Sequence, residues 1–432
     1  MDKIGKKQIF GWVMYDWANS AFATTVMAGF FPIFFKEFWS VGTEPTLSTA
    51  RLGFAYTLTG LLMALLSPVL GAIADSGSNR KKFLIVFTIL GVVMTSSLFF
   101  VAQGNWPVAI VVYVLANIGF SGGNIFYDAL MTMIAPAKRM DYISSLGFAL
   151  GYLGGGILFA FNIWMTLNPE IFGLSSSEAA VKVSFITVGL WWTVFSIPMI
   201  LYVKESSPKE SHTALYLIKS GFLRIKKTIK EARKIKTVFL FLIGYGLYID
   251  GVNTIIRMAV DYGISIGFES NDLIIALLIT QFIGFPSAIG FGYLGQKIGA
   301  RKSIFIAIFI YLFITFWGAF MENVKEFFIL AIIVGLVQGG IQALSRSFFA
   351  KIIPRDKSAE FFGLYNMIGK FTALIGPALI GTVGLLAVSA GFASDTASRI
   401  SIVSVALLFI SGGILFYLVD PEKSKREAED IT

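Results

Sequence analysis

The chain has 432 residues, of which 56% are hydrophobic and only 14% are charged. Soluble domains carry roughly a quarter of charged residues, so most of this surface must face lipid instead of water. There is no cysteine and a single histidine, His212. These counts exclude a disulfide framework, a cysteine nucleophile, a histidine proton relay and a histidine-ligated metal site.

Twelve apolar segments are long enough to cross a bilayer, which takes about 20 residues per helix. The first follows the short basic segment Met1–Lys7 directly, continues for some 27 residues and contains Asp16. It therefore reads as a retained span and not as a cleaved signal peptide. We predict an all-α integral membrane protein with spans at 9–38, 50–74, 83–102, 107–134, 143–166, 182–203, 237–262, 272–296, 303–321, 326–350, 359–387 and 398–419.

The loops between successive spans are alternately rich and poor in lysine and arginine. If the N-terminus is cytoplasmic, the inner segments hold 27 of these residues and the outer segments hold five. The positive-inside rule predicts this pattern, and one missed or invented span would destroy it. Both termini are therefore expected in the cytoplasm. The net charge of +9 is mostly this topological signal, and a nucleic-acid partner is not required to explain it.

A polar segment, 204–236, divides the chain into two nearly equal parts. We predict a six-helix bundle over 1–203 and another over 237–432. Within the polar segment, apolar residues recur at steps of three and four with lysines between them. This spacing predicts an amphipathic helix on the anionic inner leaflet. A surface for a regulatory partner is the alternative.

The two halves repeat one another. The first helix reads D-x-x-N-S from Asp16, and the seventh reads D-x-x-N-T from Asp250. A glycine-containing basic loop follows the second helix at Gly71–Lys82 and the eighth helix at Gly292–Lys302. With a third match described next, three matches occur in the same order, which indicates an internal duplication.

The third match lies at the ends of helices 4 and 10. Aligning Pro136 with Pro354 places Asn124 on Gln342 and Asp128 on Arg346. Parallel six-helix halves joined by a linker are a transporter architecture in which substrate binds between the halves, near the midplane.

Several of these segments also resemble a known family. The G-x-x-x-D loop at Gly71–Asp75 resembles the loop signature of the major facilitator superfamily, although the first copy is one residue longer and the second has Gln296 in place of the acid. The segments YDWANSAFATT, DGVNTI, QGGIQALSRS and FFGLYNMIGK with its GPALIG continuation resemble the vacuole-effluxer-like branch, named for a fungal autophagy-related amino-acid exporter. The resemblance implies the 6+6 pseudo-symmetric major-facilitator fold, a cavity lined by helices 1, 4, 7 and 10, and ion-driven efflux of amino acids or similar solutes.

Six ionisable residues lie well inside the predicted spans, at least four residues from either end. On insertion scales each costs about 2.5–3.5 kcal/mol at a helix centre, so they must pair or face a water-reachable cavity. A purely structural bundle has little reason to carry them, which favours transport. They are Asp16, Asp128, Asp250, Arg257, Arg346 and Lys370.

Polar residues form stripes at helical spacing around these charges, and we predict that the stripes line the space between the halves. Exposure of such stripes to lipid would be unfavourable. The predicted substrate-binding or ion-coupling residues are Asp16, Asn19, Asn117, Asn124, Asp250, Asn253, Arg257, Gln338, Gln342, Asn366 and Lys370.

Each stripe has a structural alternative. The amides could satisfy one another inside one half, and Asp16 and Asp250 could cap broken helices. Lys370 could bind a substrate carboxylate or neutralise an acid, and Arg257 could extend to the outer interface.

Four further residues are predicted to act in gating. Asp128 and Arg346 occupy equivalent places with opposite charge, so we expect them to meet across the halves and close the inner gate. Asp75 and Arg80 are expected to steady the inner loop, with Asp75 near the N-terminal end of helix 11. In addition, Gly147, Gly151 and Gly155 predict a close-packing face, and the Gly376-Pro377 pair predicts a bend in helix 11.

The sequence thus predicts a secondary active transporter that works by alternating access, with a proton as coupling ion at Asp16 or Asp250. The mixed cavity charges fit a zwitterionic or amphiphilic solute, such as an amino acid, a peptide or a lysolipid. A non-transporting sensor or scaffold is the alternative of another class. No phosphate-binding loop or H-E-x-x-H motif is present, and no enzyme activity is expected. We expect no cofactor and no metal, a small-molecule substrate as partner, a monomer, and a location in the bacterial inner membrane.

Overall fold

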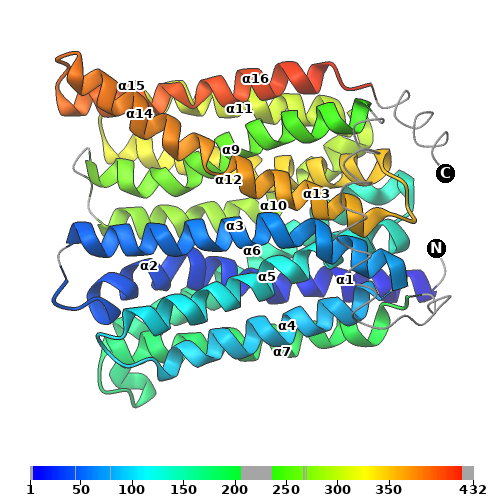
Figure 1. Ribbon diagram of the computed structural model, residues 1–432, viewed down its shortest axis with the longest axis horizontal. Coiled ribbons are helices and arrows are strands. Elements are labelled where there is room, and N and C mark those ends of the chain that lie inside the picture. Colours follow the sequence, from blue (N-terminus) through cyan, green and yellow to red (C-terminus); the bar gives the residue numbers. More distant parts are fainter. Residues whose placement is uncertain are drawn as a thin grey trace.

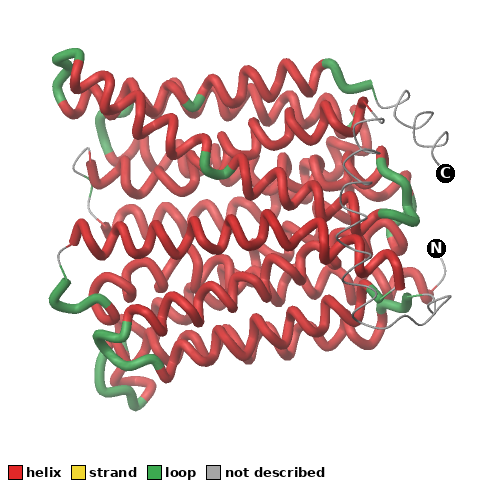
Figure 2. Tube along the Cα trace, viewed as in Figure 1, coloured by secondary structure: helices red, strands yellow, loops and turns green. Residues whose placement is uncertain are grey.

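The computed structural model describes residues 3–43, 45–77, 79–205, 236–265, 268 and 270–420. Over these residues the chain is a bundle of long helices joined by short loops (Figure 2). The described residues include twelve helices long and apolar enough to span a membrane, which confirms the predicted all-α class. They are Gly5–Trp39, Phe54–Ala72, Arg80–Phe100, Trp106–Ile134, Ala137–Leu167, Ser177–Tyr202, Lys236–Ile256, Ile275–Ile298, Ala300–Phe320, Val324–Ile352, Ser358–Ser389 and Thr396–Tyr417.

We call the part up to Glu205 the N-terminal half and the part from Lys236 the C-terminal half. The N-terminal half contains α1 (Lys3–Ala21), η1 (Phe22–Phe30), α2 (Phe31–Phe34), η2 (Phe35–Trp39), α3 (Pro45–Gly77), α4 (Arg80–Ser97), η3 (Leu98–Phe100), α5 (Trp106–Ile134), η4 (Ala137–Arg139), α6 (Met140–Leu167), η5 (Pro169–Phe172) and α7 (Ser177–Tyr202). The C-terminal half contains α9 (Lys236–Ser265), α10 (Ser270–Ile298), α11 (Ala300–Phe320), α12 (Val324–Ile352), α13 (Ser358–Thr372), α14 (Ile375–Ser389), α15 (Ser394–Ser404) and α16 (Ala406–Tyr417).

Helix α1 begins and helix α16 ends at the same end of the bundle, on the right in Figure 1. We call this the terminal end and its opposite the far end. Most of the predicted linker 204–236, including its amphipathic pattern, lies outside the described residues. The exact division into two six-helix domains therefore stays a prediction.

Five helices form most of the seam between the halves. Helix α3 packs along α13, and α6 packs along α10 and α12, while the other long helices pack largely on members of their own half. Where α3 meets α13, the two helices are so close that Gly71 lies against the backbone of Ala359. The loop signature at Gly71 thus begins where the two halves touch.

Three helices depart from the simple spans that hydropathy predicts. The outer part of helix 1 is wound as a π-helix over Phe22–Phe30 and again over Phe35–Trp39. The eleventh span is broken between α13 and α14, two residues ahead of the predicted bend at Gly376-Pro377. The twelfth span is broken at Val405, between α15 and α16. Proline within the first turn of α14 is compatible with a helix start, because that N–H has no partner within the helix.

The predicted glycine face of α6 packs against the polar stripe of α1. A Cβ atom on Gly147 would lie 2.8 Å from Asp16 Oδ2, and one on Gly151 would lie 2.5 Å from Ser20 Oγ. A Cβ atom on Gly155 would lie 2.6 Å from Thr24 Oγ1 and 2.9 Å from the Ser20 carbonyl oxygen. The absence of side chains at these positions lets α1 approach α6 closely enough to place Asp16 at the seam.

Replacing Gly155 with alanine should therefore destabilise the protein by about 1–3 kcal/mol, the usual range for overpacking a tight interface. The matched control is Gly156→Ala, one residue along the same helix, where a new Cβ meets only ordinary contacts from 3.4 Å outward. Thermal unfolding in detergent measures the difference. Equal melting temperatures for the two variants would contradict the close-packing interpretation.

Candidate functional site

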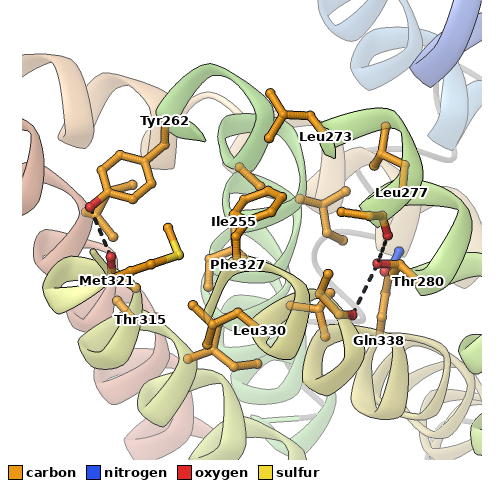
Figure 3. Close-up of a pocket in the computed structure, with 18 residues that line it drawn as sticks. Ile255, Tyr262, Leu273, Leu277, Thr280, Thr315, Met321, Phe327, Leu330 and Gln338 are labelled. Atoms are coloured by element: carbon orange, nitrogen blue, oxygen red, sulfur yellow. Dashed lines mark hydrogen bonds between the residues drawn. The ribbon is translucent and has the colours of Figure 1, made fainter. Parts of the chain in front are cut away.

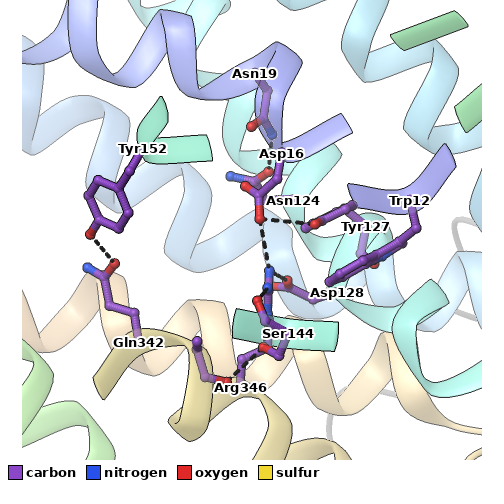
Figure 4. Close-up of polar contacts among 11 residues, drawn as sticks. Trp12, Asp16, Asn19, Asn124, Tyr127, Asp128, Ser144, Tyr152, Gln342 and Arg346 are labelled. Carbon is purple, nitrogen blue, oxygen red and sulfur yellow. Dashed lines mark hydrogen bonds and ion pairs between the residues drawn. The ribbon is translucent and has the colours of Figure 1, made fainter. Parts of the chain in front are cut away.

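The site is centred on Arg346 of α12, whose residue surface is 3% exposed. Its guanidinium crosses the seam and donates from Nη1 to Asp128 Oδ1 at 3.1 Å, from Nε to Ser144 Oγ at 2.9 Å and from Nη2 to the Ser144 carbonyl oxygen at 2.8 Å. The Asp16 carboxylate lies 3.7 Å from Nη1. One cation of the C-terminal half is thus held by α1, α5 and α6 of the N-terminal half (Figure 4).

Aromatic rings enclose the same guanidinium. Its central carbon lies 4.3 Å from the ring centre of Phe148, 4.9 Å from that of Trp12 and 5.3 Å from that of Tyr127. Trp12 and Tyr127 are stacked with centroids 4.3 Å apart. A cation over an aromatic face is attracted by the ring quadrupole, more strongly where water is excluded. The rings also keep the ion pairs out of bulk solvent.

The neighbouring hydrogen bonds orient the acidic side of the cluster. Tyr127 donates from its hydroxyl to Asp16 Oδ2 at 3.0 Å, and Trp12 donates from its ring N–H to the Tyr127 carbonyl at 2.8 Å. Ser144 donates its hydroxyl to the Ala343 carbonyl of α12 at 2.7 Å and accepts from Arg346 with the same oxygen. These contacts fix the Arg346 side chain and its carboxylate partners in one arrangement.

The charges in this cluster do not cancel. With Asp16 and Asp128 both ionised, two carboxylates share one guanidinium, leaving one net negative charge. Removing one partner of a buried ion pair typically costs about 3–5 kcal/mol, because the other charge stays buried and uncompensated. The side chains of Asp16 and Asp128 remain 12% and 11% exposed, against 4% for Arg346. Both carboxylates are therefore more accessible than the cation that holds them.

Two amide contacts lie farther from the terminal end. Asn19 of α1 donates to Asn124 Oδ1 of α5 at 2.7 Å, inside the N-terminal half. Tyr152 of α6 donates across the seam to Gln342 Oε1 of α12 at 3.3 Å. Gln342 therefore continues the contact between halves one helical turn beyond Arg346.

A second ionic contact closes the seam at the terminal end. Lys351 Nζ lies 2.7 Å from both carboxylate oxygens of Asp141, and Ser347 donates to Asp141 Oδ1 at 2.6 Å. Asp141 stands in the first turn of α6 and Lys351 in the last turn of α12, where each charge suits the helix dipole. This pair is absent from the predicted site residues because both lie next to loops, outside the predicted spans or at their ends. Their opposite charges at the ends of facing helices were the available signal.

The basic loop after α3 also reaches the C-terminal half. Arg80, 7% exposed, donates from Nη2 to the carbonyl of Asp356 at 3.3 Å, just ahead of α13. Glu205 accepts hydrogen bonds from the backbone N–H groups of Arg80 and Lys81 at 3.1 and 3.0 Å, which caps α4 from the end of the N-terminal half. The side chain of Asp75 lies outside the described residues.

Asp250 occupies a different place from its counterpart Asp16. It is fully buried within the C-terminal half, where Oδ2 accepts from the Gly376 N–H at 2.7 Å and Oδ1 from the Thr254 hydroxyl at 3.4 Å. The carboxylate thus caps the start of α14, where the unpaired N–H groups favour a negative charge. Of the two interpretations given by the sequence, this geometry favours helix capping.

The remaining predicted residues are distributed as follows. Asn117 forms bonds within α5, donating to Tyr113 and accepting from Ser121. Asn366 donates to the Phe362 carbonyl and lies beside Asp128. Asn253 and Lys370 are half-buried on α9 and α13, and the side chain of Arg257 lies outside the described residues. Gln338 lines a pocket inside the C-terminal half.

The described residues contain no group of three or more acidic, histidine or cysteine side chains that could hold a metal ion. The polar groups gathered around Arg346 are instead two carboxylates, a phenol, a serine and nearby amides. Such a set can bind and release a proton, bind a charged solute and exchange ion pairs. It offers no nucleophile paired with a base.

The arrangement of helices identifies the class. The human organic anion transporter MFSD10 superposes on the chain with a TM-score of 0.68 at 11% identity, covering 96% of this chain and 98% of that structure. At this identity the likeness shows the fold alone. Together with the twelve apolar helices, it defines a multi-pass membrane protein with the major-facilitator fold.

Sequence comparison gives the family. An uncharacterized MFS-type transporter of Bacillus subtilis (strain 168), YxiO, is 39% identical over 97% of this chain and 96% of its own length. Autophagy-related protein 22 of Coccidioides immitis (strain RS) is 24% identical over 99% of this chain and 88% of its own length. The family model described as "Vacuole effluxer Atg22 like" matches residues 48–140 and 134–429. The chain belongs to this family of transporters, and its relatives are not enzymes.

Neutralising the central cation should loosen the seam. We expect Arg346→Gln to raise the alkylation rate of a cysteine at Ser145 several-fold, because Ser145 is fully buried beside Gly292 of α10 and becomes reachable only when α6 and α10 separate. The chain has no native cysteine, so a single reporter can be labelled with N-ethylmaleimide in nanodiscs.

The control reporter is a cysteine at Glu170, which is exposed on η5 at the far end. Its labelling rate should be the same whether or not the Arg346→Gln substitution is present. An unchanged rate at Ser145→Cys in the Arg346→Gln background would show that the guanidinium does not hold the seam closed.

Proposed function

We propose that the protein is a proton-coupled secondary active transporter that exports a small amino-acid-like or zwitterionic solute by alternating access. The observation that carries this proposal is the binding of Arg346 by Asp16 and Asp128 of the opposite half. Such an ion-pair cluster holds the halves together in one state, and its disruption permits the other state. The resemblance to a family named for efflux supports the direction of transport.

In this proposal the terminal end is cytoplasmic, as the distribution of lysine and arginine predicts, and the protein acts as a monomer in the bacterial plasma membrane. The ionic contacts Arg346–Asp128 and Lys351–Asp141 join the N-terminal half to the C-terminal half on the side of the terminal end. The state described is then closed toward the cytoplasm. The inner gate thus consists of two ionic layers, with the contact between Arg80 and Asp356 at its rim.

Coupling follows from the excess negative charge of the cluster. A proton bound at Asp16 cancels one charge and removes the attraction between that carboxylate and Arg346. The hold on the guanidinium is then reduced to Asp128 and Ser144, which lowers the barrier to separation of the halves. A proton that arrives from the far side after solute release would in this way favour return to the cytoplasm-facing state, giving exchange of solute for proton.

The solute class follows from the same groups. The Asp128 carboxylate can bind an ammonium group, while Arg346 and Lys370 can bind a carboxylate once their own partners move. A molecule with both charges close together can engage both kinds of group across the seam. The half-buried amides Asn124 and Gln342 flank this position and can orient the solute by hydrogen bonds.

The proposal predicts a specific separation of activities for Asp16→Asn in proteoliposomes. Counterflow of a labelled amino acid, which needs no net proton movement, should stay within about threefold of the wild type. Uptake or efflux driven by an imposed pH gradient should fall to background, because the neutral amide cannot carry the proton. The matched control is Glu170→Gln, an exposed acid at the far end, which should leave both activities unchanged.

Retention of pH-driven transport by Asp16→Asn would exclude this residue as the coupling site. The same preparation tests the alternatives. Counterflow of a lysolipid but of no amino acid would favour an amphiphile transporter, and the absence of any counterflow would favour a sensor or scaffold.

A further inference from the structure

The C-terminal half contains a pocket of about 110 Å³ that the proposed transport mechanism does not use. It lies among α9, α10, α11, α12 and α15, toward the far end, and is lined almost entirely by apolar side chains (Figure 3). Ile255, Leu273, Phe327 and Leu330 form much of its wall. An apolar cavity on the order of 150 Å³ in another protein stays free of water and binds benzene.

The corresponding place in the N-terminal half is filled by aromatic rings. The alignment of Asp16 with Asp250 places Phe22 on Ile256, and that of Pro136 with Pro354 places Phe120 on Gln338. Phe22 and Phe120 pack with centroids 5.4 Å apart, and both contact the ring of Trp192. Ile256 and Gln338 both line the pocket, so the space lies where the other half places two rings.

One polar atom distinguishes this pocket from a simple packing defect. The side-chain carbonyl oxygen of Gln338 is buried and has no hydrogen-bond partner among the described residues. The other polar groups of the lining are already engaged: Thr280 donates to the carbonyls of Ala276 and Ala331, and Tyr262 donates to that of Gly318. A buried acceptor without a donor is unfavourable, so Gln338 can accept a bond from an occupant.

The pocket also has an accessible side. Gln338 lies one helical turn, about 6 Å, from Gln342 along α12, and Gln342 accepts from Tyr152 across the seam. The Gln338 end of the pocket therefore lies near the boundary between the halves. A ligand could enter there when the seam opens.

From these features we propose that the C-terminal half binds a compact molecule with a single aromatic or alicyclic ring and one O–H or N–H donor. The ring fills the space that Phe22 and Phe120 fill in the other half, and the donor bonds to Gln338 Oε1. This site is separate from the ion-pair cluster and does not depend on the proposed function.

Fluorine NMR of the purified protein in nanodiscs tests the proposal with two probes of nearly equal shape, 4-fluorophenol and 4-fluorotoluene. We expect saturable binding of 4-fluorophenol, about tenfold tighter than that of 4-fluorotoluene, because only the phenol can donate a hydrogen bond to the buried oxygen. Empty nanodiscs report partition into lipid. Equal signals with and without protein, or equal affinities for the two probes, would overturn the proposal.

Three variants separate the ring from the hydrogen bond. Gln338→Phe introduces the residue found at the equivalent place and should abolish binding of both probes. Gln338→Leu keeps the space but removes the acceptor, so the two probes should bind with similar affinity. The control Leu336→Phe adds a ring to an exposed position of the same helix and should bind as the wild type does. Wild-type binding by Gln338→Phe would place the probes elsewhere.

Discussion

One guanidinium inside the membrane organises the contact between the two halves. Arg346 cannot lose its charge at any physiological pH, and an isolated charge at this depth is strongly unfavourable. Its partners come from three helices of the opposite half, so these helices must stay together while the cation is buried there. Separation of the halves requires a new partner for Arg346, a weaker set of present partners, or water. In the proposed mechanism, a proton or a solute bound at the two carboxylates weakens the present set of partners.

The packing around the cluster serves this contact. The glycine face of α6 admits α1 closely enough for Asp16 to reach the guanidinium, and a Cβ atom on Gly147 would meet both the Asp16 carboxylate and the Tyr127 hydroxyl at 2.8 Å. The pair Asp141–Lys351 adds an ionic layer at the terminal end. In contrast, the equivalent acid of the C-terminal half, Asp250, supports the start of α14. The two halves therefore share this sequence pattern, but the two acids make different contacts.

Much of this arrangement could be predicted from the sequence, and the physical reasons are specific. Charges within apolar segments have few acceptable environments. The pattern of spans, the internal repeat and the opposite charges were therefore sufficient to predict that Asp128 and Arg346 meet. Ser144 and Trp12 could not be found in this way, because neutral side chains are common in membrane helices and carry no comparable signal. The π-helix of Phe22–Phe30 likewise has the same apolar composition as an α-helical span.

The position of Gln338 shows a limit of periodicity. Gln338 and Arg346 are eight residues apart, which rotates one against the other by about 80° in an α-helix. A stripe that faces the seam at Arg346 has therefore turned toward the interior of the C-terminal half at Gln338. Spacing alone predicted one continuous lining, whereas the helix geometry divides it between the seam and the apolar pocket.

The central claim is that the Arg346 cluster holds the terminal end closed. Spin labels at Lys138→Cys and Arg355→Cys, two exposed positions on opposite halves at this end, report their separation by double electron–electron resonance in a protein with no other cysteine. We expect one dominant short distance with Arg346 present and a second, longer population in Arg346→Gln. The same short distance in both proteins would contradict it.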